Sequence, residues 1–180
     1  MLKKLSLLTL AASATLFSSI AFSATDGTSD TTSTGSVDIQ VTKGDGVRIS
    51  DLQDFDFGVG TTVPLKLIDD ICIYSTTGSY NITVFSNGNG SGGTQLRMTS
   101  ATTTEFIQYF AQFRPDTNSQ SGNNLSHNIP SATYNNADTV SDSCSGGVNS
   151  RLIIEISEPS YNAATPDTYT DTLTLLVQPI

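Results

Sequence analysis

Alternation of apolar and polar residues with a period of two is the main pattern along this chain. Such a period places every second side chain on the same face of a β-strand, so each run predicts a strand with one apolar face. Three runs in the middle of the chain show it: Tyr80, Ile82 and Val84; Ile107, Tyr109, Ala111 and Phe113; and Leu152, Ile154 and Ile156. We expect these faces to form the core.

The C-terminal run repeats the pattern. Tyr169, Leu173, Leu175 and Val177 share one face, and Thr170, Thr172 and Thr174 share the other. Pro179 cannot donate to a strand ladder, so we expect this strand to end by about Gln178. Polar, glycine-rich stretches separate the runs, and no stretch longer than ten residues has a helical period. Many short strands without helices between them predict one all-β domain, an antiparallel β-sandwich with Greek-key connections.

The N-terminus reads as a secretory leader. Lys3 and Lys4 precede a largely apolar run from Leu5 to Phe22, and Ala21-Phe22-Ser23 offers small residues at the spacing that signal peptidase prefers. We place cleavage after Ser23, which gives a signal peptide at residues 1–23. A retained membrane helix is the weaker reading, because serine and threonine interrupt the run and no stop-transfer pattern follows.

A second alternating segment, Ser36-Val37-Asp38-Ile39-Gln40-Val41-Thr42, follows a spacer rich in threonine, serine and glycine. A strand needs an edge with which to pair, and the edge for this one belongs either to its own domain or to another molecule. Glycines at positions 44 and 46 would form a hinge before the domain. We therefore divide the mature chain into a flexible extension, residues 24–46, and a sandwich domain, residues 47–180.

Composition and cysteine usage both fit export. Without the leader the chain has six basic and 17 acidic residues, a formal charge of −11 that repels nucleic acid and anionic lipid. Cys72 and Cys144 are the only cysteines. In an oxidising compartment such a lone pair is expected to form a disulfide, the alternative being two unpaired thiols, and neither has the spacing of a redox or metal motif.

Nothing in the sequence indicates catalysis. His127 is the only histidine and lies in a polar stretch, so we expect a solvated loop residue rather than a general base. Asp51, Asp54 and Asp56, and the pair Asp69-Asp70, lack the spacing and central glycine of a calcium loop. We predict no enzyme, no metal site and no cofactor.

The order of several motifs resembles chaperone-usher pilins, more narrowly their archaic, Csu-type or spore coat protein U-like branch. The motifs are Gly35-Ser36-Val37-Asp38-Ile39, Asp56-Phe57-Gly58, Ile71-Cys72-Ile73 running into Tyr80-Asn81-Ile82-Thr83-Val84, and Tyr169-Thr170-Asp171-Thr172-Leu173. The resemblance spans nearly the whole mature chain.

The resemblance implies an incomplete immunoglobulin-like sandwich with a groove that a donor strand completes. A periplasmic chaperone would lend a strand first, and at an outer-membrane usher the N-terminal strand of the next subunit would replace it. Val37, Ile39 and Val41 would then be the donor residues, and Tyr169, Leu173, Leu175 and Val177 would wall the groove. The chain would be a structural subunit of a surface fimbrium that supports adhesion or biofilm formation.

One feature departs from the family. Csu-type pilins commonly have a cysteine in the first strand, where this chain has Val47-Arg48-Ile49, so its disulfide must join different elements. The alternative to a pilin is a monomeric exported binding module, in which residues 37–41 form the first strand of a complete sandwich.

Overall fold

The structure is a computed structural model that describes residues 25–59, 65–89 and 93–180. The predicted leader, residues 1–23, lies outside the described residues. The described chain divides into two units, with the boundary between Lys43 and Gly44.

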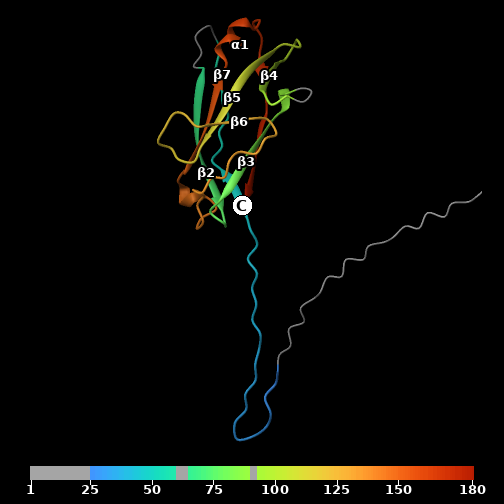
Figure 1. Ribbon diagram of the computed structural model, residues 1–180, viewed down its shortest axis with the longest axis vertical. Helices are drawn as coiled ribbons and strands as arrows, with labels where there is room; N and C mark the ends of the chain where they lie inside the picture. The colour runs from blue at the N-terminus through green and yellow to red at the C-terminus, as the bar shows by residue number, and fades with distance from the viewer. Residues whose placement is uncertain (1–24, 60–64, 90–92) are drawn as a thin grey trace, which may run out of the picture. The chain divides into compact units, whose positions relative to one another are not determined.

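The second unit is an all-β, antiparallel sandwich of the immunoglobulin-like class (Figure 1). Its larger sheet has seven strands in the order β1-β2-β7-β5-β4-β8, with β6 also paired to β5, and its smaller sheet consists of β3 and β9. The strands are β1 Val47–Ser50, β2 Lys66–Ser75, β3 Tyr80–Ser86, β4 Leu96–Ser100, β5 Phe106–Arg114, β6 Asn123–Leu125, β7 Ser150–Ile156, β8 Tyr169–Thr170 and β9 Leu173–Pro179. The only helices among the described residues are α1 Glu158–Ala163 and two 3-10 turns, η1 Asn87–Asn89 and η2 Cys144–Gly146.

The core lies between the two sheets and consists of the faces that the alternation predicted. Tyr80, Ile82 and Val84 of β3 are fully buried against side chains of the larger sheet. Those side chains include Ile71, Ile73, Tyr109, Ala111, Phe113, Leu152 and Ile154. The rings of Tyr80 and Phe113 meet edge to face across the layers, with centroids 6.2 Å apart. The predicted all-β sandwich is therefore confirmed.

The predicted C-terminal strand is two strands. Tyr169 and Thr170 pair with β4 in the larger sheet, whereas β9 pairs with β3 in the smaller one. The chain changes sheets at Asp171 and Thr172, which period-two alternation cannot reveal because the same face stays inward. β9 also runs one residue further than expected, to Pro179.

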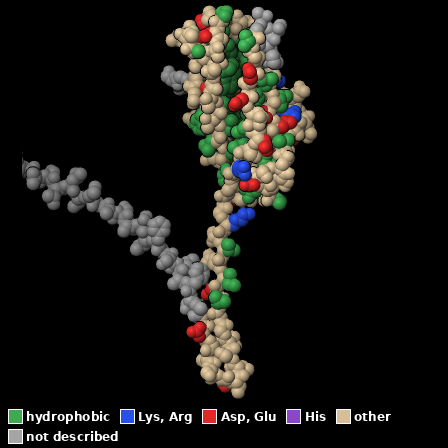
Figure 2. Space-filling model, turned by 180° about the vertical axis from the view of Figure 1, so that it is seen from behind, with side chains coloured by type: hydrophobic (Ala, Val, Ile, Leu, Met, Phe, Trp, Pro, Cys, Tyr) green, Lys and Arg blue, Asp and Glu red, His purple; other side chains and the backbone are tan. Residues whose placement is uncertain are grey.

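The N-terminal unit has no strand among its described residues. One isolated bridge joins Thr25 and Ser36, with backbone hydrogen bonds of 3.0 Å in each direction. From Val37 to Lys43 no backbone pairing is present, and hydrophobic side chains project along the segment (Figure 2). Among the described residues this segment therefore forms no strand, and the edge with which it would pair stays a prediction.

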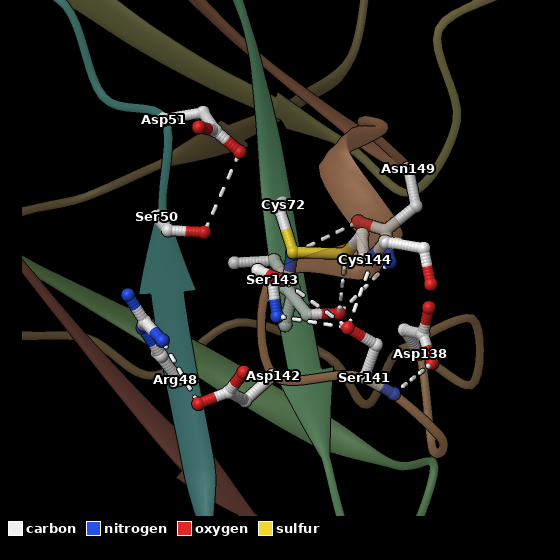
Figure 3. Close-up of a disulfide and its surroundings, with 12 residues drawn as sticks. Arg48, Ser50, Asp51, Cys72, Asp138, Ser141, Asp142, Ser143, Cys144 and Asn149 are labelled. Carbon is white, nitrogen blue, oxygen red and sulfur yellow. Dashed lines mark hydrogen bonds and ion pairs between the residues drawn. A yellow bond between two sulfur atoms is a disulfide. The ribbon is translucent and has the colours of Figure 1, made fainter.

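The disulfide joins Cys72 of β2 to Cys144 in η2, which confirms the predicted bond (Figure 3). It fixes the loop between Asp138 and Asn149 to the end of β2. Within that loop Asp138 accepts hydrogen bonds from the N–H groups of Val140 and Ser141, which lower the pKa of its carboxyl. The Asn149 amide extends the ladder, because it accepts from the N–H of Ile73 at 2.9 Å and donates to its carbonyl at 2.8 Å.

His127 differs from the expected solvated loop residue. Its Nδ1 accepts a hydrogen bond from the N–H of Ser86 at 3.0 Å, and its ring meets Phe85 edge to face. The imidazole is half-buried and pairs with the end of β3. The sequence around His127 is polar, but in the folded chain the residue lies beside β3 of the smaller sheet.

Replacing Cys72 and Cys144 together by serine is expected to lower the free energy of unfolding by about 3 to 4 kcal/mol, because the bond closes a long loop in the unfolded chain. The sequence separation of the two cysteines is 72 residues. The check is denaturant unfolding of three samples: the variant, the wild type, and the wild type with reductant. Equal denaturation midpoints in all three would show that the bond adds no stability.

Asp69 provides a test of pH dependence. Burial raises the pKa of its carboxyl above the ordinary value of 3.8, the N–H of Gln53 lowers it, and Asp70 and Asp51 raise it. The folded state therefore holds this proton more tightly than the unfolded state does. The free energy of unfolding then falls as the pH rises from the pKa of the unfolded state through that of the folded state. We expect Asp69→Asn to be more stable than the wild type at pH ~7, with the difference vanishing at pH ~3.

Asp70→Asn is the matched control. Hydrogen bonds from Arg151 lower the pKa of Asp70, so its contribution has the opposite sign. This variant should be less stable than the wild type at neutral pH. The measurement is the thermal unfolding midpoint of both variants and the wild type at the two pH values. If both variants shifted the midpoint in the same direction at neutral pH, the opposite roles assigned to Asp69 and Asp70 would be wrong.

Candidate functional site

The candidate site is a groove beside the open edge of β9. β9 pairs only with β3, in the register Val84↔Leu175 and Ile82↔Val177. Beyond the ends of this ladder, Asn87 donates to the carbonyl of Thr172 and Ile180 to that of Ser79. Bonded pairs alternate along an antiparallel ladder, so the backbone groups of Thr174, Leu176 and Gln178 face β3. Those of Leu173, Leu175 and Val177 face away from it.

The opposite edge of the smaller sheet is covered. The N–H and carbonyl of Tyr80 bond to Tyr134, at 3.0 and 2.8 Å. Further along, Ser131 donates to the carbonyl of Ile82 and Asn128 to that of Val84. Among the described residues, nothing equivalent pairs with the outer edge of β9. Unpaired strand edges are sites at which another strand can add.

Pro179 fits the end of this edge. By the same alternation its nitrogen lies on the open side of β9 and not on the β3 side. The missing N–H therefore costs no bond to β3, which is why the strand includes the proline. The open edge offers N–H donors at Leu173, Leu175 and Val177 and none beyond them.

The groove itself has a volume of about 460 Å³ and is largely apolar. Leu173 and Leu175 of β9 form one wall, and Leu152 and Ile154 of β7 contribute to the lining from the larger sheet. The remaining lining residues are Leu52, Gln53, Asp54, Phe55, Phe57, Met98, Tyr109, Tyr169, Thr170, Asp171 and Thr172. Figure 2 shows hydrophobic side chains at the bottom of a hollow in the domain, with acidic side chains beside it.

The four predicted wall residues have different positions. Tyr169, Leu173 and Leu175 line the groove. Val177 is not part of the lining but is buried in the core next to it, with 9% of its surface exposed. Leu176 points to the outer face of the smaller sheet and is 43% exposed, as expected from the alternation along β9.

The segment after β1 forms the wall facing β9. Asp51 has φ of 65°, a left-handed conformation that turns the chain away from the edge of β2. Gln53 donates its N–H to the buried carboxylate of Asp69 at 2.9 Å, and Phe55 and Phe57 pack on the core. Phe55 and Leu52 are groove residues that the sequence pattern did not identify, although Phe55 and Phe57 alternate with Asp54 and Asp56.

Asp171 occupies the end of the groove. It accepts hydrogen bonds from the N–H of Gly88 at 2.9 Å and from the hydroxyl of Tyr109 at 2.6 Å. Burial raises the pKa of Tyr109, and the carboxylate of Asp171 raises it further, so this hydroxyl stays a donor. The carboxylate is thus held in a fixed position among largely apolar neighbours.

The three predicted donor residues lie in the N-terminal unit. Val37, Ile39 and Val41 are 70%, 90% and 91% exposed. Large β-branched side chains with this exposure lose the free energy that burial would supply, about 1.5 to 3 kcal/mol each. The segment is therefore available to bind an apolar surface.

The described ranges contain no cluster of side chains suited to metal binding. There, no three His, Cys, Asp or Glu side chains are arranged to hold a metal ion. The same residues include no helix of sufficient length and apolar character to cross a membrane.

Comparison with known proteins gives structural matches only. No protein-family model and no curated protein matches the chain. One structural match is the chaperone–tip adhesion subunit pre-assembly complex CsuC–CsuE, from archaic chaperone-usher Csu pili of Acinetobacter baumannii. It aligns with a TM-score of 0.44 and 18% identity over 76% of this chain and 40% of the other.

A second match is a chaperone–tip adhesin complex of CFA/I fimbriae. It has a TM-score of 0.47 and 15% identity over 74% of this chain and 41% of the other. This chain therefore spans about two fifths of the length of each matched chain. Function has to be argued from the groove and the exposed segment.

Proposed function

We propose that this protein is a structural subunit of a chaperone-usher surface pilus and polymerises by donor-strand exchange. The observation that carries the proposal is the open edge of β9 beside an apolar groove. Its outward-facing backbone groups belong to residues 173, 175 and 177, and the exposed apolar residues 37, 39 and 41 have the same spacing. A strand added there would satisfy the edge and bury these side chains in one step.

The free energy expected from burial of the donor side chains is large enough for a stable contact between subunits. Burial of Val37, Ile39 and Val41 would yield roughly 5 to 9 kcal/mol before the backbone ladder is added and the cost of ordering the segment is subtracted. The donor segment and the groove are different surfaces, so the contact between copies is heterologous. Repeated without ring closure, such a contact produces an open fibre.

The proposed partners are those that the resemblance to chaperone-usher pilins implies. A periplasmic chaperone would fill it before assembly, an outer-membrane usher would host the exchange, and other pilin subunits would complete it in the fibre. The route leads through the periplasm to the cell surface, with adhesion or biofilm formation as the outcome. The net charge of −11 after removal of the leader disfavours nucleic acid and direct membrane insertion.

The second candidate is a monomeric exported binding module whose own segment fills the groove. It is favoured by the short connection from Val41 to β1, in which Gly44 and Gly46 permit a tight turn. In that case the sandwich would be complete within one molecule.

Replacing Ile39 by Asp is expected to abolish fibre formation, because a carboxylate would have to enter the apolar groove. Gln40→Asp is the matched control: its side chain would lie on the outer face of an added strand, so fibres should form normally. The readout is an SDS gel of mature protein from the periplasm, run with and without boiling. A normal boiling-sensitive ladder from the Ile39→Asp variant would refute the donor assignment.

Deletion of residues 24–42 separates the two candidates. A subunit that donates its strand to a neighbour should lose the ladder seen for the wild type on the same gel. If the wild type is instead a stable monomer and the deletion variant is unfolded by circular dichroism, the segment completes its own sandwich and the binding module is the correct function.

A further inference from the structure

The inference rests on the proposed function and concerns the direction and register of the incoming strand. The exposed segment reads Val37-x-Ile39-x-Val41-x-Lys43, and the receiving strand with the residue before it reads Asp171-x-Leu173-x-Leu175-x-Val177. Read in opposite directions the two patterns are complementary: three apolar residues face three apolar residues, and a lysine faces an aspartate.

Lys43 is the cation for which the described residues offer no partner. Six basic residues follow position 23, and five of them are engaged. Arg48, Lys66, Arg114 and Arg151 form ion pairs with Asp142, Glu155, Asp116 and Asp70, and the guanidinium of Arg97 lies 4.2 Å from the centre of the Phe106 ring. Within the described ranges, Lys43 has no such partner.

Asp171 is the matching anion. Its carboxylate lines the end of the groove and is held by the Gly88 N–H and the Tyr109 hydroxyl, both neutral donors. No Lys or Arg in the described part of the domain forms an ion pair with it. A carboxylate oxygen can accept more than one hydrogen bond, so both oxygens retain acceptor capacity for an ammonium group.

Strand direction decides whether the two charges meet. If Ile39 lies opposite Leu175 in an antiparallel pair, Val41 lies opposite Leu173 and Lys43 opposite Asp171. In a parallel pair with the same central contact, Lys43 lies opposite Pro179, which has no charge. Charge complementarity therefore selects the antiparallel direction.

The antiparallel direction also selects a second molecule as the donor. β1 begins next to the end of β9: Gly46 accepts from Thr76, and Ile180 donates to Ser79 across the same turn. A segment of the same chain, antiparallel to β9, would need Val41 at the far end of that strand. The six residues from Val41 to Val47 would then have to span about 20 Å, which is their fully extended length. A parallel insertion needs only a turn.

We propose that the groove binds residues 37–43 of a second copy of this chain, antiparallel to β9, in a register that the Lys43–Asp171 ion pair fixes. The apolar triplets supply the burial and the ion pair excludes shifts by two residues, which would leave both charges without partners.

Cysteine cross-linking in full-length, assembled protein tests the register. Gln40→Cys combined with Thr174→Cys places two outer-face side chains opposite each other in the antiparallel register. We expect a ladder that survives boiling without reductant and collapses with reductant. Thr42→Cys combined with Gln178→Cys is the control, because these positions face each other only in the parallel register; all four native residues are exposed.

The outcomes separate the inference from the proposed function. Cross-linking of the 42–178 pair, or of neither pair while an unboiled ladder still forms, would overturn the register but leave strand exchange intact. Absence of any ladder from the wild type would overturn the proposed function and this inference with it.

The role of the ion pair is tested by a double-mutant cycle. Lys43→Gln should make the ladder dissociate about two- to fivefold faster in warm SDS, the range for a partly exposed ion pair. In an Asp171→Asn background the same change should have no further effect, whereas in Asp54→Asn, which alters another groove carboxylate, the effect should persist. An equal effect of Lys43→Gln in the Asp171→Asn background would refute the pair.

Discussion

One edge of β9 has no pairing partner among the described residues, and the character of the groove follows from it. Its free N–H and carbonyl groups belong to Leu173, Leu175 and Val177, whose side chains face the core. Backbone polar groups beside an apolar surface are costly when they lack partners. The other edge of the same sheet is covered by residues 128–134, so in the described part of the domain the edge of β9 is the place in this sheet where a strand could add.

Several contacts within the domain fix the walls of the groove beside β9. The disulfide and the Asn149 amide fix the end of β2, and the left-handed turn at Asp51 directs the following segment over the groove, where Phe55 and Phe57 pack. The hydrogen-bonded pair of Tyr109 and Asp171 lies at the opposite end. Each of these contacts is made within the domain, so the groove does not depend on the incoming strand for its walls. This arrangement is suited to the exchange of one occupant for another.

The extension complements the domain in both polarity and charge. Its three large apolar residues are all exposed, and its lysine is the one cation of the mature chain without a partner among the described residues. An acidic domain whose basic residues are already engaged favours a partner strand that ends in a positive charge. A second copy of the same chain would supply such a strand, as we propose.

Local features could be predicted from the sequence: which runs alternate, which face of each is apolar, and which two cysteines can pair. Period-two alternation is a property of neighbouring residues, so the faces of β3, β5 and β7 followed directly from it. The other features depend on contacts between distant parts of the chain. Alternation cannot show that the chain changes sheets at Asp171, that Phe55 lines a groove, or that His127 returns to Ser86, because these depend on which strands pair. The open edge of β9 can likewise be identified only when the pairing of the other described strands is known.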